Sequence, residues 1–290
     1  MQKIGFIGTG IMGRPMAGHL QAAGHQLYLS THRTPPPAEL IEGGAIQCDS
    51  PEQVAQQADT IIVMVPDTPQ VESVLFGENG VAAGLDSGKL VIDMSSISPI
   101  ETKAFAARIN ELGCDYLDAP VSGGEVGAKN AALTIMVGGS EAAFSKASPL
   151  FEAMGKNITL VGDNGAGQTC KVANQIIVAL TIEAVGEALV FASKAGVDPA
   201  RVRQALMGGF AGSKILEVHG ERMIKRTFDP GFRIELHQKD LNLALSGARA
   251  LGVSLPNTAT AQELFNACDG KLDHSALVKA LEGLAGHTVT

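Results

Sequence analysis

The chain has 290 residues, of which 45% are hydrophobic and 18% are charged, a composition typical of a folded globular protein rather than a disordered one. Its net charge of −8, from 30 acidic and 22 basic residues, disfavours a nucleic-acid or anionic-membrane surface unless basic groups cluster, and the sequence has no such cluster. The length favours two domains, with one doubly wound domain as the alternative.

Export, membrane insertion and metal binding are not indicated. The first apolar run, Ile4 to Ile7, begins too early to leave room for a signal peptide. The most apolar stretch, Ile176 to Ile182, is far shorter than a membrane span. The cysteines are dispersed without a C-x-x-C pair, which argues against a zinc site or a disulfide framework: Cys48, Cys114, Cys170 and Cys268. We therefore expect a cytoplasmic protein that binds no membrane, nucleic acid or metal.

Short apolar runs alternate with turns and helical patterns through roughly the first 160 residues, which predicts β-α-β units. Several of these runs lack polar alternation, as is typical of strands covered on both faces of a parallel sheet. The predicted strands are Lys3 to Ile7, Gln26 to Ser30, Thr60 to Val65, Leu90 to Met94, Asp115 to Leu117, Thr134 to Val137 and Ile158 to Val161.

The pattern changes at the Gly-rich segment 162–167, after which strand patterns are absent. The predicted helices are Gln168 to Ala195, Pro199 to Met207, Lys214 to Lys225, Leu236 to Ala250 and Thr258 to Asn266. We therefore expect an α/β fold with a Rossmann-type, doubly wound, mostly parallel sheet in residues 1–162. An all-helical domain of residues 163–290 would follow, beginning with a long interdomain helix.

A dinucleotide-binding motif lies between the first predicted strand and the first helical pattern: Gly8, Thr9, Gly10, Ile11, Met12 and Gly13. In such a motif the first glycine allows a tight turn, the second lets the backbone approach a pyrophosphate, and the third allows close helix packing. The strand and helix around it make dinucleotide binding the favoured interpretation over a structural glycine turn.

The end of the second predicted strand bears on which dinucleotide binds. It carries Ser30, Thr31 and Arg33 and no carboxylate, whereas NAD enzymes usually have an acidic residue there for the ribose hydroxyls. An arginine suits the geometry of a 2′-phosphate. The sequence thus predicts NADP, with NAD as the alternative and a solvated Arg33 as the other interpretation of that residue.

Asp93 to Ser96 ends another predicted strand, and its hydroxyls, including that of Ser96, are suited to approach the nicotinamide end of the cofactor. A further predicted strand ends at Val65 and Pro66, which are also candidate cofactor residues. Asp118 to Gly124 also follows a strand, at the sheet edge where open α/β folds bind ligands. There Ser122 and the N–H groups of Gly123 and Gly124 form a small anion cradle, or else an ordinary turn.

Lys171, Asn174 and Gln175 stand at i, i+3 and i+4 of the long predicted helix and therefore share one face of it. Reduction of a carbonyl by hydride creates an alkoxide, and a partly desolvated lysine can protonate it. Lys171 is thus a candidate general acid, with Asn174 beside it; the alternative is a lysine that extends to solvent. Lys239 lies on a later helix and either closes over the site or belongs to a solvated face.

Together these motifs resemble the β-hydroxyacid dehydrogenase family, and the likeness covers essentially the whole chain. The motifs stand in family order: Gly8 to Gly13, Asp118 to Gly124, Gly167 to Asn174 and Lys239 to Leu241. The resemblance implies that Lys171 is the catalytic acid, that Ser122, Gly123 and Gly124 bind the substrate carboxylate, and that Asn174 lies beside it. It also implies that Ser96 and Lys239 line the cofactor site, and that the protein forms a homo-oligomer, a dimer or tetramer, through its helical domain.

Within the family, Asp93 to Pro99 and Asn174 to Leu180 are most similar to members that reduce tartronate semialdehyde to D-glycerate. The expected substrate is therefore a small carboxylate semialdehyde. The same residues would serve in a 3-hydroxyisobutyrate dehydrogenase or a succinic semialdehyde reductase. A non-catalytic NADP-binding sensor is the alternative of another class, against which the combination of Lys171, Asn174 and Ser122 argues.

Overall fold

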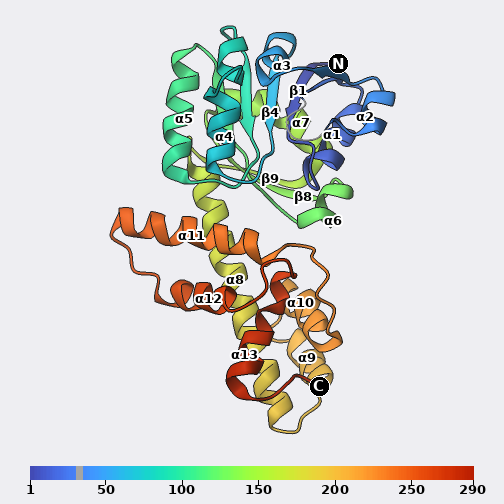
Figure 1. Cartoon of the computed structure of the whole chain (residues 1–290), viewed down its shortest axis with the longest axis vertical. Helices are drawn as coiled ribbons and strands as arrows, with labels where there is room; N and C mark the ends of the chain where they lie inside the picture. The colour runs from blue at the N-terminus through green and yellow to red at the C-terminus, as the bar shows by residue number, and fades with distance from the viewer. Residues whose placement is uncertain (31–34) are drawn as a thin grey trace. The chain divides into compact units, whose positions relative to one another are not determined.

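The computed structural model describes residues 1–30 and 35–290, and the predicted cofactor residues Thr31 and Arg33 lie outside this part. The chain divides into two compact units, Met1–Lys171 and Val172–Thr290, coloured from blue to yellow-green and from yellow to red in Figure 1. This division falls inside one continuous helix, α8, rather than at the Gly-rich loop 162–167.

The first unit is built on one mixed sheet with the order β3-β2-β1-β4-β5-β6-β8-β7, and β9 pairs with β8. The strands from β3 to β6 run parallel, β8 is antiparallel to β6 and β7, and β9 is parallel to β8. The strands are β1 Lys3–Ile7, β2 Gln26–Ser30, β3 Ile46–Cys48, β4 Thr60–Val63, β5 Leu90–Asp93, β6 Asp115–Asp118, β7 Val121–Ser122, β8 Leu133–Gly138 and β9 Gly155–Gly162.

Helices cover both faces of this sheet. Successive side chains of a strand point to opposite faces, so each strand can contribute to two cores. Ile4 and Phe6 of β1 belong to the core formed with α1 and α7, whereas Ile7 belongs to the core formed with α3, α4 and α5 (Figure 1). The elements are α1 Gly13–Ala22, α2 Ala38–Glu42, α3 Pro51–Gln57, α4 Thr68–Phe76, the 3-10 helix η1 Val81–Gly84, α5 Pro99–Glu111, α6 Gly124–Lys129 and α7 Glu141–Met154.

The strand order reverses between β1 and β4, since the chain moves from β1 outward to β2 and β3 and then returns to β4 on the other side. In open α/β sheets the crevice for a ligand lies outside the carboxyl ends of the strands at such a reversal. The loops that follow β1, β4, β5 and β6 all leave from this edge.

The second unit is helical and has its own core, contributed by α8, α10, α11, α12 and α13. Its described residues contain no strand, and only an isolated bridge joins Arg233 to Asp273. The elements are α8 Ala166–Lys194, α9 Pro199–Met207, α10 Lys214–Lys225, α11 Ile234–Leu251, α12 Pro256–Asn266, the 3-10 helix η2 His274–Leu277 and α13 Val278–Ala285.

One helix of the described residues, α8, is long and apolar enough to cross a membrane by length and composition alone. The run 176–182 is part of an unbroken helix of 29 residues, whose most apolar window has a mean hydropathy of 1.9. The core helix of a soluble protein meets the same criteria of length and composition. Here α8 contributes Ala179, Ile182 and Leu189 to the core of the helical unit.

Candidate active site

The geometry of the glycine-rich loop between β1 and α1 agrees with the spacing of its glycines. Gly8 has a φ of +102°, and a Cβ there would overlap the carbonyl oxygen of Met64 in the loop after β4. A Cβ at Gly13 would overlap the carbonyl oxygen of Gly8. At Gly10, by contrast, no described atom lies within 4 Å of the Cβ position. The outer glycines are therefore required by chain packing, while the middle one faces open space that a pyrophosphate can approach.

The start of α1 suits an anion, which supports the fit of a dinucleotide to this edge. Met12 precedes the helix without a side-chain cap, and the first turn carries no acidic residue. Unpaired N–H groups and the helix dipole favour negative charge at such a terminus. At the end of β2, Ser30 has a buried Oγ with no hydrogen-bond partner among the described residues, so a polar group is available there too. Thr9 and Ile11 complete the loop, and Ile11 is 65% exposed.

The loops after β4 and β5 are joined by hydrogen bonds. The N–H of Val65 donates to Oγ of Ser95 at 3.0 Å, and the N–H of Ser95 donates to Oδ1 of Asp93 at 3.0 Å. Tyr116 donates its hydroxyl to the other oxygen of Asp93 at 3.2 Å. Burial raises the pKa of Asp93 to about 7, although the hydrogen bonds from Ser95 and Tyr116 oppose the shift. The segment that carries Pro66 is thus attached to the segment that carries Ser96.

Gln168, in the first turn of α8, holds the loop after β5. Its buried side chain donates from Nε2 to the carbonyl oxygen of Ser95 at 2.7 Å and accepts at Oε1 from the N–H of Ile97 at 3.0 Å. These two partners flank Ser96. Gln168 stands one helical turn before Lys171, so the same turn fixes the Ser96 loop and the candidate acid.

Asp118, at the end of β6, caps the start of α8. Its two carboxylate oxygens accept from the N–H groups of Gly165 at 2.7 Å and Gln168 at 2.9 Å. Burial raises the pKa of Asp118, while these backbone hydrogen bonds act in the opposite direction. An acidic group at a helix N-terminus also interacts favourably with the helix dipole.

The candidate carboxylate cradle follows Asp118 directly along the chain. Ser122 ends the short strand β7, and Gly123 and Gly124 then have φ values of +128° and +59°. These left-handed conformations turn the chain from β7 into α6 and explain why two glycines stand together here. Ser122 is half-buried and Gly123 is exposed, so the turn is accessible to a small anion.

Lys171 is buried, with 7% of its surface exposed, so it does not extend into solvent. In the helical unit, Asn174 donates from Nδ2 to Oε1 of Gln175 at 2.7 Å, and Gln175 donates from Nε2 to Oδ2 of Asp240 at 2.6 Å. The ammonium of Lys239 pairs with Oδ1 of Asp240 at 3.0 Å, and its side chain is only 18% exposed. A continuous polar array thus joins Asn174 to Lys239, and Lys239 is not part of a solvated face.

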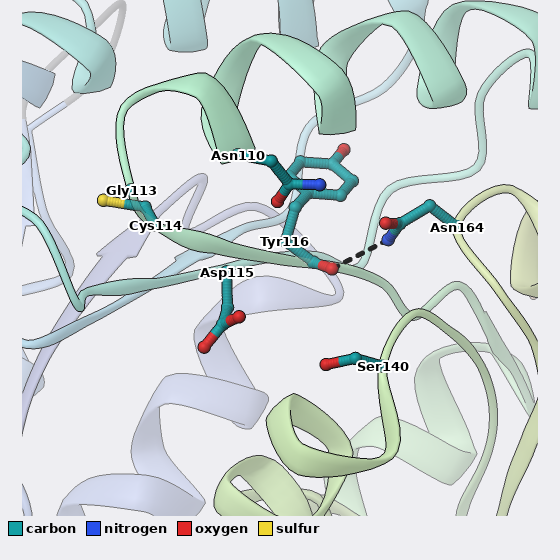
Figure 2. Close-up of a pocket in the computed structure, with 7 residues that line it drawn as sticks. All are labelled: Asn110, Gly113, Cys114, Asp115, Tyr116, Ser140 and Asn164. Atoms are coloured by element: carbon teal, nitrogen blue, oxygen red, sulfur yellow. Dashed lines mark hydrogen bonds between the residues drawn. The ribbon is translucent and has the colours of Figure 1, made fainter.

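A pocket of about 330 Å³ lies elsewhere in the first unit, at the amino end of β6 (Figure 2). Within it the side chain of Asn164 donates to the carbonyl oxygen of Tyr116 at 2.8 Å. Its lining residues are Asn110, Gly113, Cys114, Asp115, Tyr116, Ser140 and Asn164. None of them is a candidate site residue, and the amino end of a strand is opposite to the edge that carries the cofactor motif.

Both halves of the chain match known families. Residues 3–162 match the family described as the NAD binding domain of 6-phosphogluconate dehydrogenase, and residues 165–281 match the NAD-binding domain of NADP-dependent 3-hydroxyisobutyrate dehydrogenase. The 2-hydroxy-3-oxopropionate reductase of Escherichia coli (strain K12) is 68% identical over 98% of this chain and 99% of its own. The chain belongs to the β-hydroxyacid dehydrogenase family.

Other members are similar over the whole length as well. A probable 3-hydroxyisobutyrate dehydrogenase-like protein of Arabidopsis thaliana is 40% identical over 97% of this chain and 86% of its own. The solved 3-hydroxyisobutyrate dehydrogenase of Mycobacterium tuberculosis has a TM-score of 0.89 at 32% identity, covering 97% of this chain and 99% of that structure. This β-hydroxyacid dehydrogenase is therefore an NAD(P)-dependent oxidoreductase with a Rossmann domain and a helical C-terminal domain, as the sequence predicted.

Four supporting residues of this dehydrogenase have roles that the sequence motifs do not predict. Asp118 and Gln168 lie within the motifs Asp118 to Gly124 and Gly167 to Asn174. Gln175 shares a helix face with Lys171, and Asp240 follows Lys239. Each is buried in the structure and hydrogen-bonded, which is the usual condition for a polar group inside a protein.

Proposed function

We propose that this protein is a 2-hydroxy-3-oxopropionate reductase, which reduces the aldehyde of tartronate semialdehyde to give D-glycerate. The observation that carries the proposal is the 68% identity to the Escherichia coli enzyme of that name over nearly the full length of both chains. The substrate is then a small carboxylate semialdehyde, which agrees with a site made of an anion cradle and a buried lysine.

The proposed roles of the residues follow from the chemistry. When bound, NAD(P)H supplies a hydride to the carbonyl carbon. Ser122 and the N–H groups of Gly123 and Gly124 hold the substrate carboxylate and so orient the aldehyde. Lys171 transfers a proton from Nζ to the carbonyl oxygen and regains it from solvent, and in the reverse direction it accepts that proton. Asn174 stabilises the charge that develops on the oxygen.

The proposed cofactor residues of the first unit lie at the carboxyl edge of its sheet, and the family resemblance adds Lys239 of the helical unit. The loop Gly8 to Gly13 and the start of α1 take the pyrophosphate, with Thr9, Ile11 and Met12 as its other members. Val65, Pro66, Ser96 and Lys239 take the nicotinamide end. NADP is the proposed cofactor because Ser30, Thr31 and Arg33 offer two hydroxyls and a guanidinium for a 2′-phosphate.

Arg33→Ala tests this preference. It should raise the KM for NADPH about tenfold or more and leave the KM for NADH nearly unchanged, because only NADPH carries the phosphate. Arg201→Ala, an exposed arginine of α9 in the helical unit, is the control. Wild-type protein that prefers NADH would refute the proposal.

We also propose a cytoplasmic homo-oligomer, dimer or tetramer, that associates through the helical unit. Ile177, Ala184 and Phe191 recur at heptad spacing on α8 and are exposed, Ile177 by 65% and Phe191 by 78%. An apolar stripe of this kind is typical of an interface. The molar mass measured by light scattering should be that of a dimer or tetramer. Phe191→Glu should lower it toward the mass of the monomer.

The deciding experiment follows NADPH and NADH oxidation with three aldehydes side by side: tartronate, methylmalonate and succinic semialdehyde. The proposal requires the highest kcat/KM for tartronate semialdehyde. Preference for methylmalonate semialdehyde would indicate a 3-hydroxyisobutyrate dehydrogenase. Preference for succinic semialdehyde would indicate a succinic semialdehyde reductase. Binding of NADPH without turnover of any aldehyde would indicate a sensor.

A further inference from the structure

Three histidine rings form a cluster in the helical unit, in which His237 and His274 are buried and His219 is partly exposed. His219 comes from α10, His237 from α11 and His274 from η2. Nδ1 of His237 and Nδ1 of His274 are 3.0 Å apart, and Nε2 of His274 and Nε2 of His219 are 3.2 Å apart. At the other end of the row, Nε2 of His237 lies 3.1 Å from the backbone oxygen of Gln175 in α8. The rings thus form one row that ends on the helix of the candidate acid.

The cluster is better suited to hydrogen bonding than to a metal ion, although His219, Asp273 and His274 lie close enough together for metal ligands. The carboxylate of Asp273 already accepts from the N–H groups of Gly231 and Phe232 and from Ser275. The guanidinium of Arg222 also contacts it at 2.6 Å. A cation would have to displace these donors next to a positive charge, which is unfavourable.

The backbone oxygen of Gln175 fixes the proton at one end of the row, because a carbonyl can only accept and Nε2 of His237 must donate to it. When His237 carries no second proton, its Nδ1 accepts from Nδ1 of His274, and Nε2 of His274 then accepts from Nε2–H of His219. Beyond the row, Nδ1 of His219 lies 3.6 Å from Oδ1 of Asp273. Burial and the adjoining rings of His237 and His219 hold the pKa of His274 well below its ordinary value, in agreement with a neutral central ring.

Gln175, whose backbone oxygen accepts from His237, is also central to the polar array that joins Asn174 to Lys239. The side chain of Gln175 accepts from Asn174 and donates to Asp240, and Asp240 in turn pairs with Lys239. The backbone of Gln175 is held by His237, which stands on α11 close to both Lys239 and Asp240 along the chain. Gln175 therefore connects the candidate substrate amide, the candidate cofactor lysine and the histidine row.

We propose that Gln175 and Asp240 are positioning residues that set Asn174 and Lys239, and that the hydrogen bond of His237 to the backbone oxygen of Gln175 sets the tautomers along the row His237–His274–His219. The positioning part rests on the proposed roles of Asn174 and Lys239. The tautomer part does not, because it follows from the described hydrogen bonds of a neutral His237.

The tautomers can be measured in the intact wild-type protein by NMR of histidines labelled with ¹⁵N, near neutral pH. We expect a proton on Nδ1 of His274 and on Nε2 of His237 and His219. His219→Gln, which retains a donor for His274, assigns the resonances and should leave the tautomer of His274 unchanged. A proton on Nε2 of His274, or on both of its nitrogens, would overturn the proposed direction.

The positioning roles are tested by kinetics. Gln175→Leu removes the partners of Asn174 and Asp240, and it should lower kcat/KM for the aldehyde about tenfold or more with little change in cofactor Kd. Asp240→Asn keeps an oxygen for Gln175 but removes the charge beside Lys239, so it should raise cofactor Kd more than substrate KM. A general loss of packing would not be expected to affect mainly aldehyde kinetics in one variant and mainly cofactor Kd in the other.

Gln262→Leu is the matched control, because Gln262 is also a buried glutamine of the helical unit but lies outside the array. Equal kinetic losses in Gln175→Leu and Gln262→Leu would overturn the positioning role. If Gln175→Leu does not fold, Gln175→Glu serves instead: it retains the size of the side chain but cannot donate to Asp240. Wild-type turnover is measured first, so that failure of the proposed function is distinguished from failure of this inference.

Discussion

The side chain of Gln168 donates to the carbonyl oxygen of Ser95 at 2.7 Å and thereby joins the first turn of α8 to the loop after β5. The same side chain accepts from the N–H of Ile97. A single buried amide therefore satisfies two backbone groups on either side of Ser96, and it does so one turn before Lys171.

Gln168→Leu should lower both stability and turnover. The leucine is of similar size but leaves the oxygen of Ser95 and the N–H of Ile97 without their partner, and buried groups left unpaired in this way cost about 1–3 kcal/mol each. Thermal unfolding and steady-state kinetics measure the two effects, with the exposed Gln57→Leu as control. Unchanged kcat in a destabilised Gln168→Leu protein would show that the residue supports the fold alone.

Lys171→Met should abolish most turnover while the cofactor still binds. Methionine retains the length of the side chain but has no proton to give, and loss of a general acid typically lowers kcat about 10² to 10⁴-fold. Fluorescence titration with NADPH checks that binding is retained, and Lys156→Met, an exposed lysine of β9, is the control. Turnover at the wild-type rate would remove Lys171 from the mechanism.

The glycine loop predicts opposite outcomes for two similar substitutions. Gly13→Ala should lower the Tm of the cofactor-free protein because its Cβ overlaps the oxygen of Gly8. Gly10→Ala meets no described atom and should leave that Tm unchanged, yet it should raise the Kd for NADPH because the methyl group lies where the pyrophosphate approaches. If Gly10→Ala binds NADPH normally, the phosphate does not lie at Gly10.

Asp93 should make stability depend on pH. Its pKa is raised by burial from 3.8 to about 7, so between these values the folded protein binds more protons than the unfolded chain. The contribution of Asp93 to stability is therefore largest below about pH 4 and is lost as the pH rises through about 7. Asp93→Asn cannot titrate, so the Tm of the wild type should fall relative to that of the variant over this range. A constant difference in Tm would contradict the raised pKa.

Much of the fold could be predicted because it depends on local patterns. The strands β1 and β2 and the helices α9 and α10 lie where apolar periodicity and flanking turn residues placed them. The sequence missed β3 and β7, since strands this short carry no readable alternation and form only by pairing with β2 and β8. It also missed α13, whose Val278 and Leu281 are buried against the helical core.

The candidate site, too, has residues that could be predicted from the sequence and residues that could not. Residues within one continuous motif, such as Gly8 to Gly13, could be recognised because their roles depend on local backbone geometry. Asp118 and Gln168 could not, because their partners lie 47 and 73 residues away along the chain, at Gly165 and Ser95. Only the folded sheet brings these groups together.

The continuity of α8 limits where the chain of this enzyme can be divided into functional fragments. The border between the two compact units separates Lys171 from Asn174 within a single helix. A fragment that ends at the border would keep Lys171, the proposed acid, but lose Asn174, and the helix would be cut near its first turns. Neither half could be grafted onto another scaffold with a working site, so we expect domain exchange between relatives to succeed only when the whole of α8 is inherited as one piece.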